Sequence, residues 1–269
     1  MLRKYIHILT IALFMQITAV NAGSTDNESL KNSGSETAAD ECFESASRVM
    51  FKINHGLDKA IFEPVAKGYR ALPVPIRKGT GNAVDNLRSL LTLSNNVLQG
   101  EFERAGNNVA RFAINSTVGI LGIFDPATKL GFEDQGKEDF GQTLGKWGAD
   151  SGCYFVLPIL GPTTTRDVIG LVGNTFLDPV YHITHNSEVN AGIGNTNYSE
   201  HNYYYYRGTS AVDFRAKNIE SFDSIEENSI DLYASLKSLY LQNRKQKIAN
   251  STSAVETQND SDWEEIDSN

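Results

Sequence analysis

The 269-residue chain has no excess of basic residues, no long apolar run and only two cysteines. Its net charge is −9, and most of it sits at the ends, because residues 23–42 carry −4 and residues 251–269 carry −6. The chain between these ends is nearly neutral, so it lacks the positive charge that a nucleic-acid-binding protein carries. With 40% hydrophobic residues, the chain is too apolar to be disordered throughout and too polar for a multi-span membrane protein.

Catalytic motifs are missing as well. The sequence contains neither a Gly-x-Ser-x-Gly nucleophile elbow nor a His-Glu-x-x-His zinc motif. The string from Gly141 to Lys146 is one residue too short for a phosphate-binding loop, and Trp147 stands where Ser or Thr is required. Four potential metal ligands lie close in sequence, namely His182, His185, Glu188 and His201. No further ligand pattern supports zinc, so we favour a polar loop and expect no enzyme activity, no metal and no cofactor.

The N-terminus has the layout of an export signal. Arg3 and Lys4 precede an apolar stretch over residues 6–20, and small residues allow cleavage after Ala22. We therefore expect residues 1–22 to be a signal peptide, with an uncleaved anchor helix as the alternative. The first cysteine after the apolar stretch is Cys42, so we find no lipid-attachment site directly behind the signal.

The mature chain reads as one domain between two polar ends. We expect a disordered leader at residues 23–41, a folded domain at residues 42–250 and a disordered acidic tail at residues 251–269. Within the domain, apolar residues recur mostly at helical spacing. The expected helices cover residues 49–61 up to a break at Pro64, residues 76–99 up to Gly100, residues 101–114, and two helices within residues 198–247.

Two short apolar runs do not resemble ordinary soluble helices. They cover residues 118–126 and 154–162, and both are far below the roughly 20 residues that a membrane-spanning helix needs. Each run could be a buried core segment or could lie within one leaflet of a membrane, and composition alone favours the core. The four tyrosines at residues 203–206 cannot all face a core, so some must meet an interface.

The order of local motifs resembles the MlaA/VacJ family of outer-membrane phospholipid-transport proteins. The resemblance covers about residues 42–247. It is carried by the ordered strings Asn54-His-Gly-Leu-Asp58, Pro64-Val-Ala66, Asn95-Asn-Val-Leu-Gln-Gly100, Arg111-Phe-Ala-Ile-Asn-Ser-Thr-Val-Gly119, Glu138-Asp-Phe-Gly-Gln-Thr-Leu-Gly-Lys-Trp-Gly148 and Leu157-Pro-Ile-Leu-Gly-Pro-Thr-Thr-Thr-Arg-Asp167.

This resemblance implies a mainly α, single-domain helical ring, shaped like a doughnut, with short hairpin insertions and amphipathic interfacial helices. Such a protein lies in the periplasmic leaflet of the outer membrane, where its channel removes misplaced phospholipids from the outer leaflet. The implied partners are phospholipids, a trimeric porin and a soluble periplasmic carrier, with no nucleic acid. The alternative is a porin-bound scaffold that transports nothing. The resemblance also shifts the interpretation of both apolar runs from core to lipid contact.

A channel needs backbone that can flex, and Gly145, Gly148 and Gly152 around Trp147 indicate a hinged hairpin beside the channel, although glycines serve tight turns equally well. We expect proline at position 148 or 152 to impair lipid movement with little loss of fold.

The sequence departs from the family in its cysteines. The family usually has a lipidated cysteine near its N-terminus, which this chain lacks. Cys42 and Cys153 both stand where relatives commonly have proline, and an even cysteine count in an oxidising compartment favours pairing. We therefore predict a disulfide between Cys42 and Cys153, with two free buried thiols as the alternative.

Overall fold

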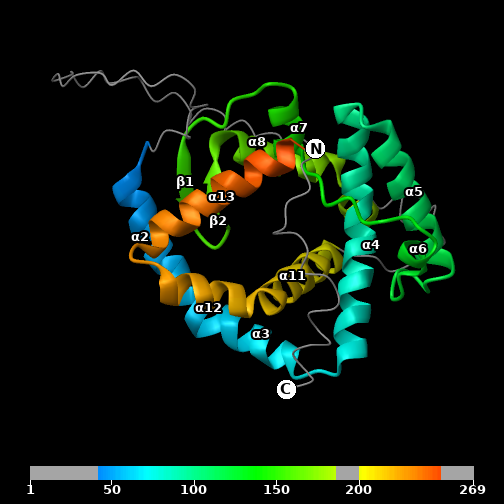
Figure 1. The fold of residues 1–269 in the computed structure, drawn as a ribbon, viewed down its shortest axis with the longest axis horizontal. Helices are drawn as coiled ribbons and strands as arrows, with labels where there is room; N and C mark the ends of the chain where they lie inside the picture. Colours follow the sequence, from blue (N-terminus) through cyan, green and yellow to red (C-terminus); the bar gives the residue numbers. More distant parts are fainter. Residues whose placement is uncertain (1–41, 186–199, 250–269) are drawn as a thin grey trace. The chain divides into compact units, whose positions relative to one another are not determined.

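The computed structural model of the chain describes residues 42–185 and 200–249. These residues are mainly helical and include a two-stranded antiparallel sheet, as Figure 1 shows. The mainly helical class that the sequence predicts is confirmed. The predicted signal peptide (residues 1–22), leader (23–41) and acidic tail (251–269) lie outside the described residues.

The first long helical segment passes through a proline. It comprises α2 (Glu44–Leu57), the π-helical turn η1 (Asp58–Phe62) and α3 (Glu63–Arg70). The expected break at Pro64 is therefore wrong. Proline removes one N–H donor and crowds the preceding turn, and the wider π-turn directly before it accommodates that crowding.

The longest described helix, α4 (Val74–Gln99), packs against α5 (Phe102–Thr117). Proline at its first turn is tolerated because the N–H group lost there has no helical partner. Gly100 ends the helix in the left-handed conformation, with a φ of 77°. Most of the buried residues of α4 are polar or glycine: Arg77, Gly79, Gly81, Asn86, Ser89, Thr92, Asn95 and Asn96.

A β-hairpin follows two short helices. The helices are α6 (Pro126–Lys129) and α7 (Phe140–Lys146), and the hairpin pairs β1 (Tyr154–Leu157) with β2 (Gly161–Thr164). Helix α8 (Thr165–Leu177) begins directly after β2 and packs against α7. Polar side chains accept hydrogen bonds from the first turns of these helices, with Asp125 capping α6, Asp139 capping α7 and Thr164 capping α8.

The C-terminal region contains one helix more than the sequence predicts. After α9 (Pro179–His185), the described chain resumes with α11 (Glu200–Lys217), α12 (Ile219–Asn228) and α13 (Leu232–Ile248). The expected pair of helices between residues 198 and 247 is therefore wrong, because breaks after residues 217 and 228 give three. Neither break contains glycine or proline, so the strongest local signals for a helix end are missing there.

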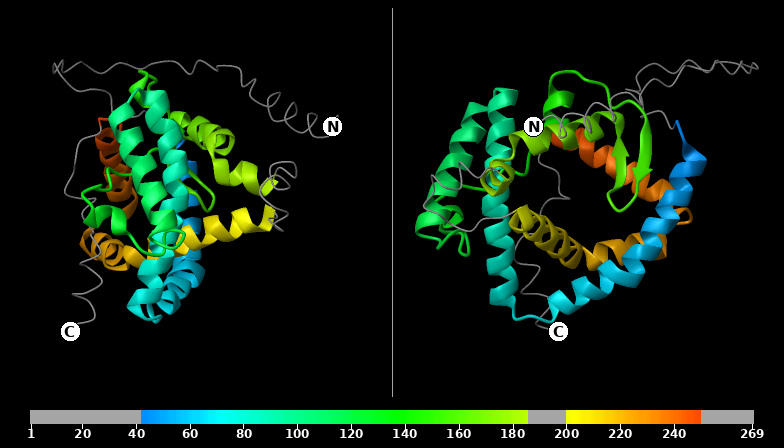
Figure 2. Two further views of the ribbon diagram at one scale, coloured as in Figure 1. Left: turned by 90° about the vertical axis from the view of Figure 1, so that its right-hand side faces the viewer. Right: turned by 180° about the vertical axis from the view of Figure 1, so that it is seen from behind.

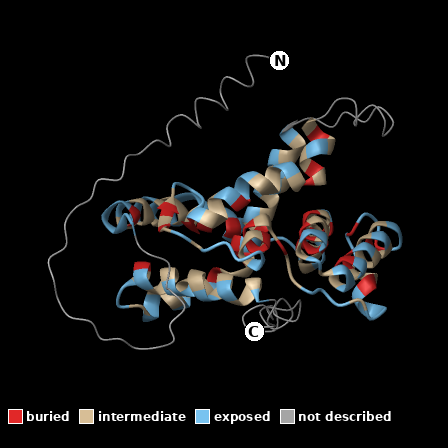
Figure 3. Ribbon diagram, turned by 90° about the horizontal axis from the view of Figure 1, so that it is seen from above, coloured by how far each residue is buried: buried red, intermediate tan, exposed pale blue. Residues whose placement is uncertain are grey.

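The described residues bury more polar than apolar side chains. Within residues 42–185 and 200–249, nineteen polar or charged residues are buried, against eleven hydrophobic ones, and many large apolar side chains are exposed. Figure 3 shows the buried positions scattered along the helices, without a single dense centre. Two small apolar clusters are present, one of Tyr154, Val156 and Tyr233, and one of Ala66, Ala216 and Ile219. A water-soluble domain usually shows the opposite balance.

The elements contact one another in a closed circuit, whose members are labelled in Figure 1 and are seen from behind in the right view of Figure 2. Helix α2 contacts β1, β2 contacts α13, and α13 contacts α7. Helix α7 in turn contacts α4, α4 contacts α11, and α11 contacts α3, which continues α2. Among the described residues, none of the helices combines the length and the apolar character needed to cross a membrane.

Candidate functional site

Two exposed apolar loops carry the backbone strain of the described chain. One follows α5 and covers residues 118–124, called here the 118–124 loop, and the other is the tip of the hairpin at residues 158–160. The described residues include three non-glycine residues with positive φ, and all three lie in these loops: Ile120 (53°), Leu121 (57°) and Ile159 (65°). Their side chains are 58%, 75% and 68% exposed. Strain of this kind persists where the surrounding structure imposes it, and it gathers at functional sites.

The 118–124 loop is closed by local backbone contacts. The N–H group of Gly122 donates to the carbonyl of Asn115 (2.8 Å), and that of Phe124 donates to the carbonyl of Gly119 (2.9 Å). A Cβ atom at Gly119 would lie 2.4 Å from the Phe124 carbonyl oxygen, so only glycine fits there. The side-chain amide of Asn82 on α4 holds the loop from outside by donating to the carbonyl of Ile123 (3.1 Å).

The second apolar run divides into a buried half and an exposed half. Tyr154 and Val156 on β1 are buried in the apolar cluster with Tyr233, whereas Ile159 and Leu160 at the tip are exposed. Alternate side chains of a strand point to opposite faces, which places Tyr154 and Val156 together on the core face. Ile159 and Leu160 lie in the turn beyond the last strand pair. The core interpretation of this run is therefore confirmed for its β1 half only, and lipid contact of the exposed tip stays a prediction.

The hairpin tip is held by a residue of α2. The side-chain amide of Asn54 donates to the carbonyl of Leu157 (2.7 Å) and accepts a hydrogen bond from the N–H group of Ile159 (2.8 Å). Both bonds link residues more than 100 positions apart in sequence. They fix the turn on either side of Pro158.

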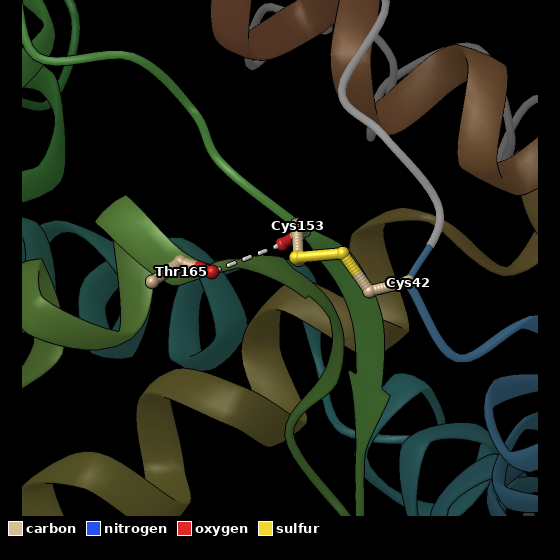
Figure 4. The surroundings of a disulfide bond; sticks show 3 residues. All are labelled: Cys42, Cys153 and Thr165. Atoms are coloured by element: carbon tan, nitrogen blue, oxygen red, sulfur yellow. Dashed lines mark hydrogen bonds between the residues drawn. A yellow bond between two sulfur atoms is a disulfide. The ribbon is translucent and has the colours of Figure 1, made fainter. Parts of the chain in front are cut away.

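A disulfide holds the other end of β1, as Figure 4 shows. Cys42, just before α2, is bonded to Cys153, just before β1, with Cα atoms 5.5 Å apart. This is the pair that the sequence analysis singles out. The carbonyl of Cys153 also accepts a hydrogen bond from the N–H group of Thr165 (3.0 Å), at the start of α8.

The predicted hinge residues lie before the hairpin. Gly145 lies within α7, where a Cβ atom would be 2.6 Å from the Cδ1 atom of Ile248, so it is a packing glycine. Gly148 and Gly152 lie in the loop between α7 and β1, with φ values of 92° and 64°. Proline cannot adopt positive φ, so the expectation that proline at these positions would spare the fold is wrong. Trp147 is exposed, and its indole N–H donates to the carbonyl of Leu98 (3.0 Å).

An ionic network joins the two segments that flank the hairpin, at Asp139 before it and Asp167 after it; these two residues are called here the hairpin root. Arg244 on α13 donates two hydrogen bonds to Asp139 (2.6 and 3.0 Å) and one to Asp167 (2.6 Å), and Tyr240 donates to the same Asp167. Burial would raise the pKa of Asp139, but its hydrogen bonds with Arg244 and the charge of Arg244 outweigh burial and hold this pKa well below its usual range. The network ties α13 to the starts of α7 and α8.

The neighbouring carboxylate has the opposite environment. Glu138 is 4% exposed and accepts a hydrogen bond from Gln99 (3.0 Å), and Arg104 lies 3.7 Å away. Burial raises the pKa of Glu138, because these partners offset only part of the lost hydration. Thr143 links the same region to Asn95 by a hydrogen bond of 2.8 Å. The motif strings 95–100 and 138–148 thus meet in one buried polar network.

His182, His185, Tyr203 and Tyr206 pack against neighbouring rings. Tyr204 and Tyr205 are exposed, whereas burial raises the pKa of Tyr206 to about 12. His185 stacks on Tyr181 with ring centroids 4.0 Å apart, and the Nε2 atom of His182 lies 2.8 Å from the carbonyl oxygen of Phe176. Among the described residues no group of metal-binding side chains converges, and Glu188 lies outside them.

A comparison with protein-family models matches residues 39–247 to the family described as MlaA lipoprotein. The chain belongs to the MlaA lipoprotein family. The family strings quoted above include Gly119, which closes the 118–124 loop against α5. They also include Asp139 and Asp167, the two carboxylates that bind Arg244.

Relatives agree with this MlaA assignment. A Haemophilus influenzae protein named intermembrane phospholipid transport system lipoprotein MlaA is 32% identical over 213 residues, covering 77% of this chain and 79% of that protein. An uncharacterized protein of Rickettsia prowazekii is 37% identical over 146 residues, covering 54% of this chain and 58% of that protein. A solved structure described as the structural basis for maintenance of bacterial outer membrane lipid asymmetry matches with a TM-score of 0.64 at 27% identity, covering 78% of this chain and 99% of that one.

Sequence reasoning missed the two asparagines that hold the loops. Asn54 and Asn82 lie on helices, and nothing in their local sequence indicates which distant loop they bind. The string Asn54-His-Gly-Leu-Asp58 belongs to the motif set, but the motif alone assigns no role to its first residue. Only the tertiary contacts show that role.

Proposed function

We propose that this chain is a phospholipid-transport protein that maintains the lipid asymmetry of an outer membrane. It acts as a channel in the periplasmic leaflet, removes misplaced phospholipids from the outer leaflet and passes them to a soluble periplasmic carrier. The name of the Haemophilus influenzae relative and the description of the matching solved structure support this transport role. As a member of a transport family, the chain is not an enzyme.

The observation that carries this proposal is that the described residues bury more polar than apolar side chains and expose many large apolar ones. A protein in contact with acyl chains can expose apolar residues, while a polar path for headgroups needs polar residues inside. The described residues meet both conditions, with polar side chains buried along α4 and strained aliphatic tips exposed at Leu121 and Ile159. The loops are too short to span a bilayer, as expected of a protein that occupies one leaflet.

We further propose that the closed circuit of helix contacts surrounds the lipid path. A phospholipid needs a polar route for its headgroup and an apolar route for its tails. The circuit through α2, α13, α7, α4 and α11 would surround such a route, and non-helical backbone at membrane depth is tolerated where it lines a polar cavity.

The hinge of this channel is proposed in the loop that contains Gly148 and Gly152. A Cβ atom added at Gly148 would meet no other atom within 4 Å, so substitutions there test backbone freedom without a clash. We expect Gly148→Asn, which tolerates left-handed φ, to keep transport, and Gly148→Val, which opposes it, to impair transport at equal protein levels. Normal transport by the valine variant would refute the hinge.

A trimeric porin is the proposed membrane partner. Ile169, Val172 and Phe176 form an exposed apolar stripe on α8, at helical spacing. The opposite side of α8 is closed by Gly170, where a Cβ atom would lie 2.4 Å from the backbone nitrogen of Gly141. The stripe is therefore a rigid, outward-facing surface that suits a protein partner in the membrane.

The decisive experiment is the amount of phospholipid in the outer leaflet of a deletion strain. We expect that amount to rise in the deletion and to return to normal with the wild-type gene. Replacing the apolar stripe by Ile169→Ser and Phe176→Ser should prevent recovery of a porin with the protein. Normal asymmetry in the deletion strain, with the porin still bound to the wild-type protein, would favour a non-transporting scaffold.

A further inference from the structure

One side chain of α2 forms hydrogen bonds on both sides of the hairpin turn. The turn at residues 158–160 follows Leu157, which is opposite Gly161 at the last paired position of the hairpin. A primary amide has one donor group and one acceptor, and Asn54 uses both here, at 2.7 and 2.8 Å. Neither Asp nor Ala can make both bonds.

The same helix reaches the hairpin at a second point. Cys42 stands two residues before the first residue of α2, Asn54 lies in its last turn, and the disulfide partner Cys153 directly precedes β1. The helical rise from Glu44 to Asn54 is roughly 15 Å, and β1 from Cys153 to Leu157 extends roughly 13 Å. Helix and strand therefore match in length between the two attachments.

We propose that Asn54 is a positioning residue that, together with the Cys42–Cys153 disulfide, joins α2 and the hairpin into one rigid body. Asn54 holds Ile159 in its left-handed conformation, and this keeps the apolar tip directed outward. The inference rests on the proposed transport function, because a fixed tip matters only where it meets lipid.

This clamp limits where the hairpin can move. The hairpin cannot swing on the 148–152 loop by itself, because Cys153 before β1 is covalently bonded to the segment before α2 and the hairpin tip is bonded to Asn54. Helix α2 continues through η1 into α3, so any hairpin motion carries this long segment with it. The loop around Gly148 then acts as the joint between this body and α7.

A double-mutant cycle with amide hydrogen exchange tests the clamp on the full-length protein in detergent. The variants are Asn54→Ala, Cys42→Ser with Cys153→Ser, and all three together. We expect Asn54→Ala to raise exchange at the Ile159 amide about tenfold, the size of one lost hydrogen bond in a locally opening turn. Because the two attachments share one body, the triple variant should exceed the product of the separate effects.

Two further variants make the test specific. Asn54→Asp keeps the acceptor for Ile159 but loses the donor to Leu157, so protection at Ile159 should survive better than in Asn54→Ala. Asn82→Ala removes a comparable asparagine bond from the 118–124 loop and should leave the hairpin unchanged. Effects that merely multiply, or equal exchange in the Asp and Ala variants, would overturn the clamp.

A cellular measurement separates this inference from the proposed function. If Asn54 positions the tip for transport, Asn54→Ala should raise outer-leaflet phospholipid at normal protein levels, with Asn54→Asp intermediate. If the wild-type gene does not restore asymmetry in a deletion strain, the proposed function fails while the exchange result still decides the clamp. If the wild type restores asymmetry and Asn54→Ala restores it fully, the positioning role is wrong.

Discussion

The 118–124 loop and the hairpin tip present similar side chains but are held in different ways. The first is closed by its own backbone and by Gly119, which fits against α5, and its backbone bonds span only a few residues. The second is held by α2, through a disulfide of sequence separation 111 and through Asn54. Exposed, strained apolar tips can thus be kept rigid either by local closure or by distant attachment.

The ion pairs next to the two loops show the same difference. Asp125 caps α6 and pairs with Arg111 (2.9 Å), only 14 residues away in sequence. At the hairpin root, Arg244 reaches Asp139 and Asp167 from the far end of the chain. The hairpin therefore depends on segments more than 70 residues away, whereas the 118–124 loop is held by bonds within its own segment and by Asn82 of α4, 41 residues away.

The largest effect should come from removing the disulfide. We expect Cys42→Ser with Cys153→Ser to lower the free energy of unfolding by about 4 kcal/mol, because the bond closes a long loop in the unfolded chain. Urea unfolding in detergent measures the loss. Hydrogen exchange should rise in the hairpin and stay unchanged in the 118–124 loop, and an equal rise in both loops would break the comparison.

Removing the charge of Asp139 from its network with Arg244 should give the next largest effect. We expect Asp139→Asn to cost about 3 kcal/mol at pH 7, because it leaves Arg244 with a buried charge that is only partly compensated. The folded-state pKa of Asp139 lies below its unfolded value, so its contribution is present above about pH 4 and is lost as the pH falls further. Unfolding followed from pH 7 to pH 3 should show this acid loss in the wild type and a weaker loss in the variant.

Asp125→Asn provides the matched control next to the 118–124 loop. Burial would raise the pKa of Asp125, but hydrogen bonds from Thr128 and Asn115 and the charge of Arg111 hold it below its usual range. Its variant should open the 118–124 loop and α6 without affecting the hairpin. A change in hairpin exchange would show that the two ion pairs are coupled.

Glycine substitutions should separate the two modes of closure. Gly119→Ala places a Cβ atom 2.4 Å from a backbone oxygen, and we expect a loss of about 2 kcal/mol from the overpacked turn. Gly161→Ala in the hairpin meets no atom within 4 Å but has a φ of 80°, so about 1 kcal/mol is expected from the left-handed backbone alone. Thermal unfolding of both variants measures the difference, and a reversed order would contradict it.

The smallest effect on stability should come from the exposed tips. Leu121→Ser and Leu160→Ser should each change the free energy of unfolding by less than about 0.5 kcal/mol. Both should weaken binding to phosphatidylethanolamine–phosphatidylglycerol vesicles by about 1–2 kcal/mol, because each removes apolar area from lipid contact. Ile230→Ser, at an exposed site between α12 and α13, is the matched control and should bind normally.

Much of the fold could be read locally. Helical periodicity, the prolines before residue 76 and Gly100 place α4 to within two residues of its structural bounds. The same signals failed at Pro64, where a π-turn absorbs the proline, and between α11 and α12, where the break has neither glycine nor proline. Local patterns report backbone preference, and at these two places the helix bounds depart from it.

The sequence by itself determined the helical class and the family, because composition and motif order do not depend on how distant segments meet. It predicted a disulfide between Cys42 and Cys153 but left two free thiols open, and the tertiary structure decided for the bond by bringing the two Cα atoms to 5.5 Å. Only the tertiary structure decided that the run at 154–162 is half core and half exposed tip, and that Asn54 holds this tip. Burial and side-chain partners depend on what lies opposite in space. At the hairpin, those partners come from α2 and α13, more than 70 residues away in either direction.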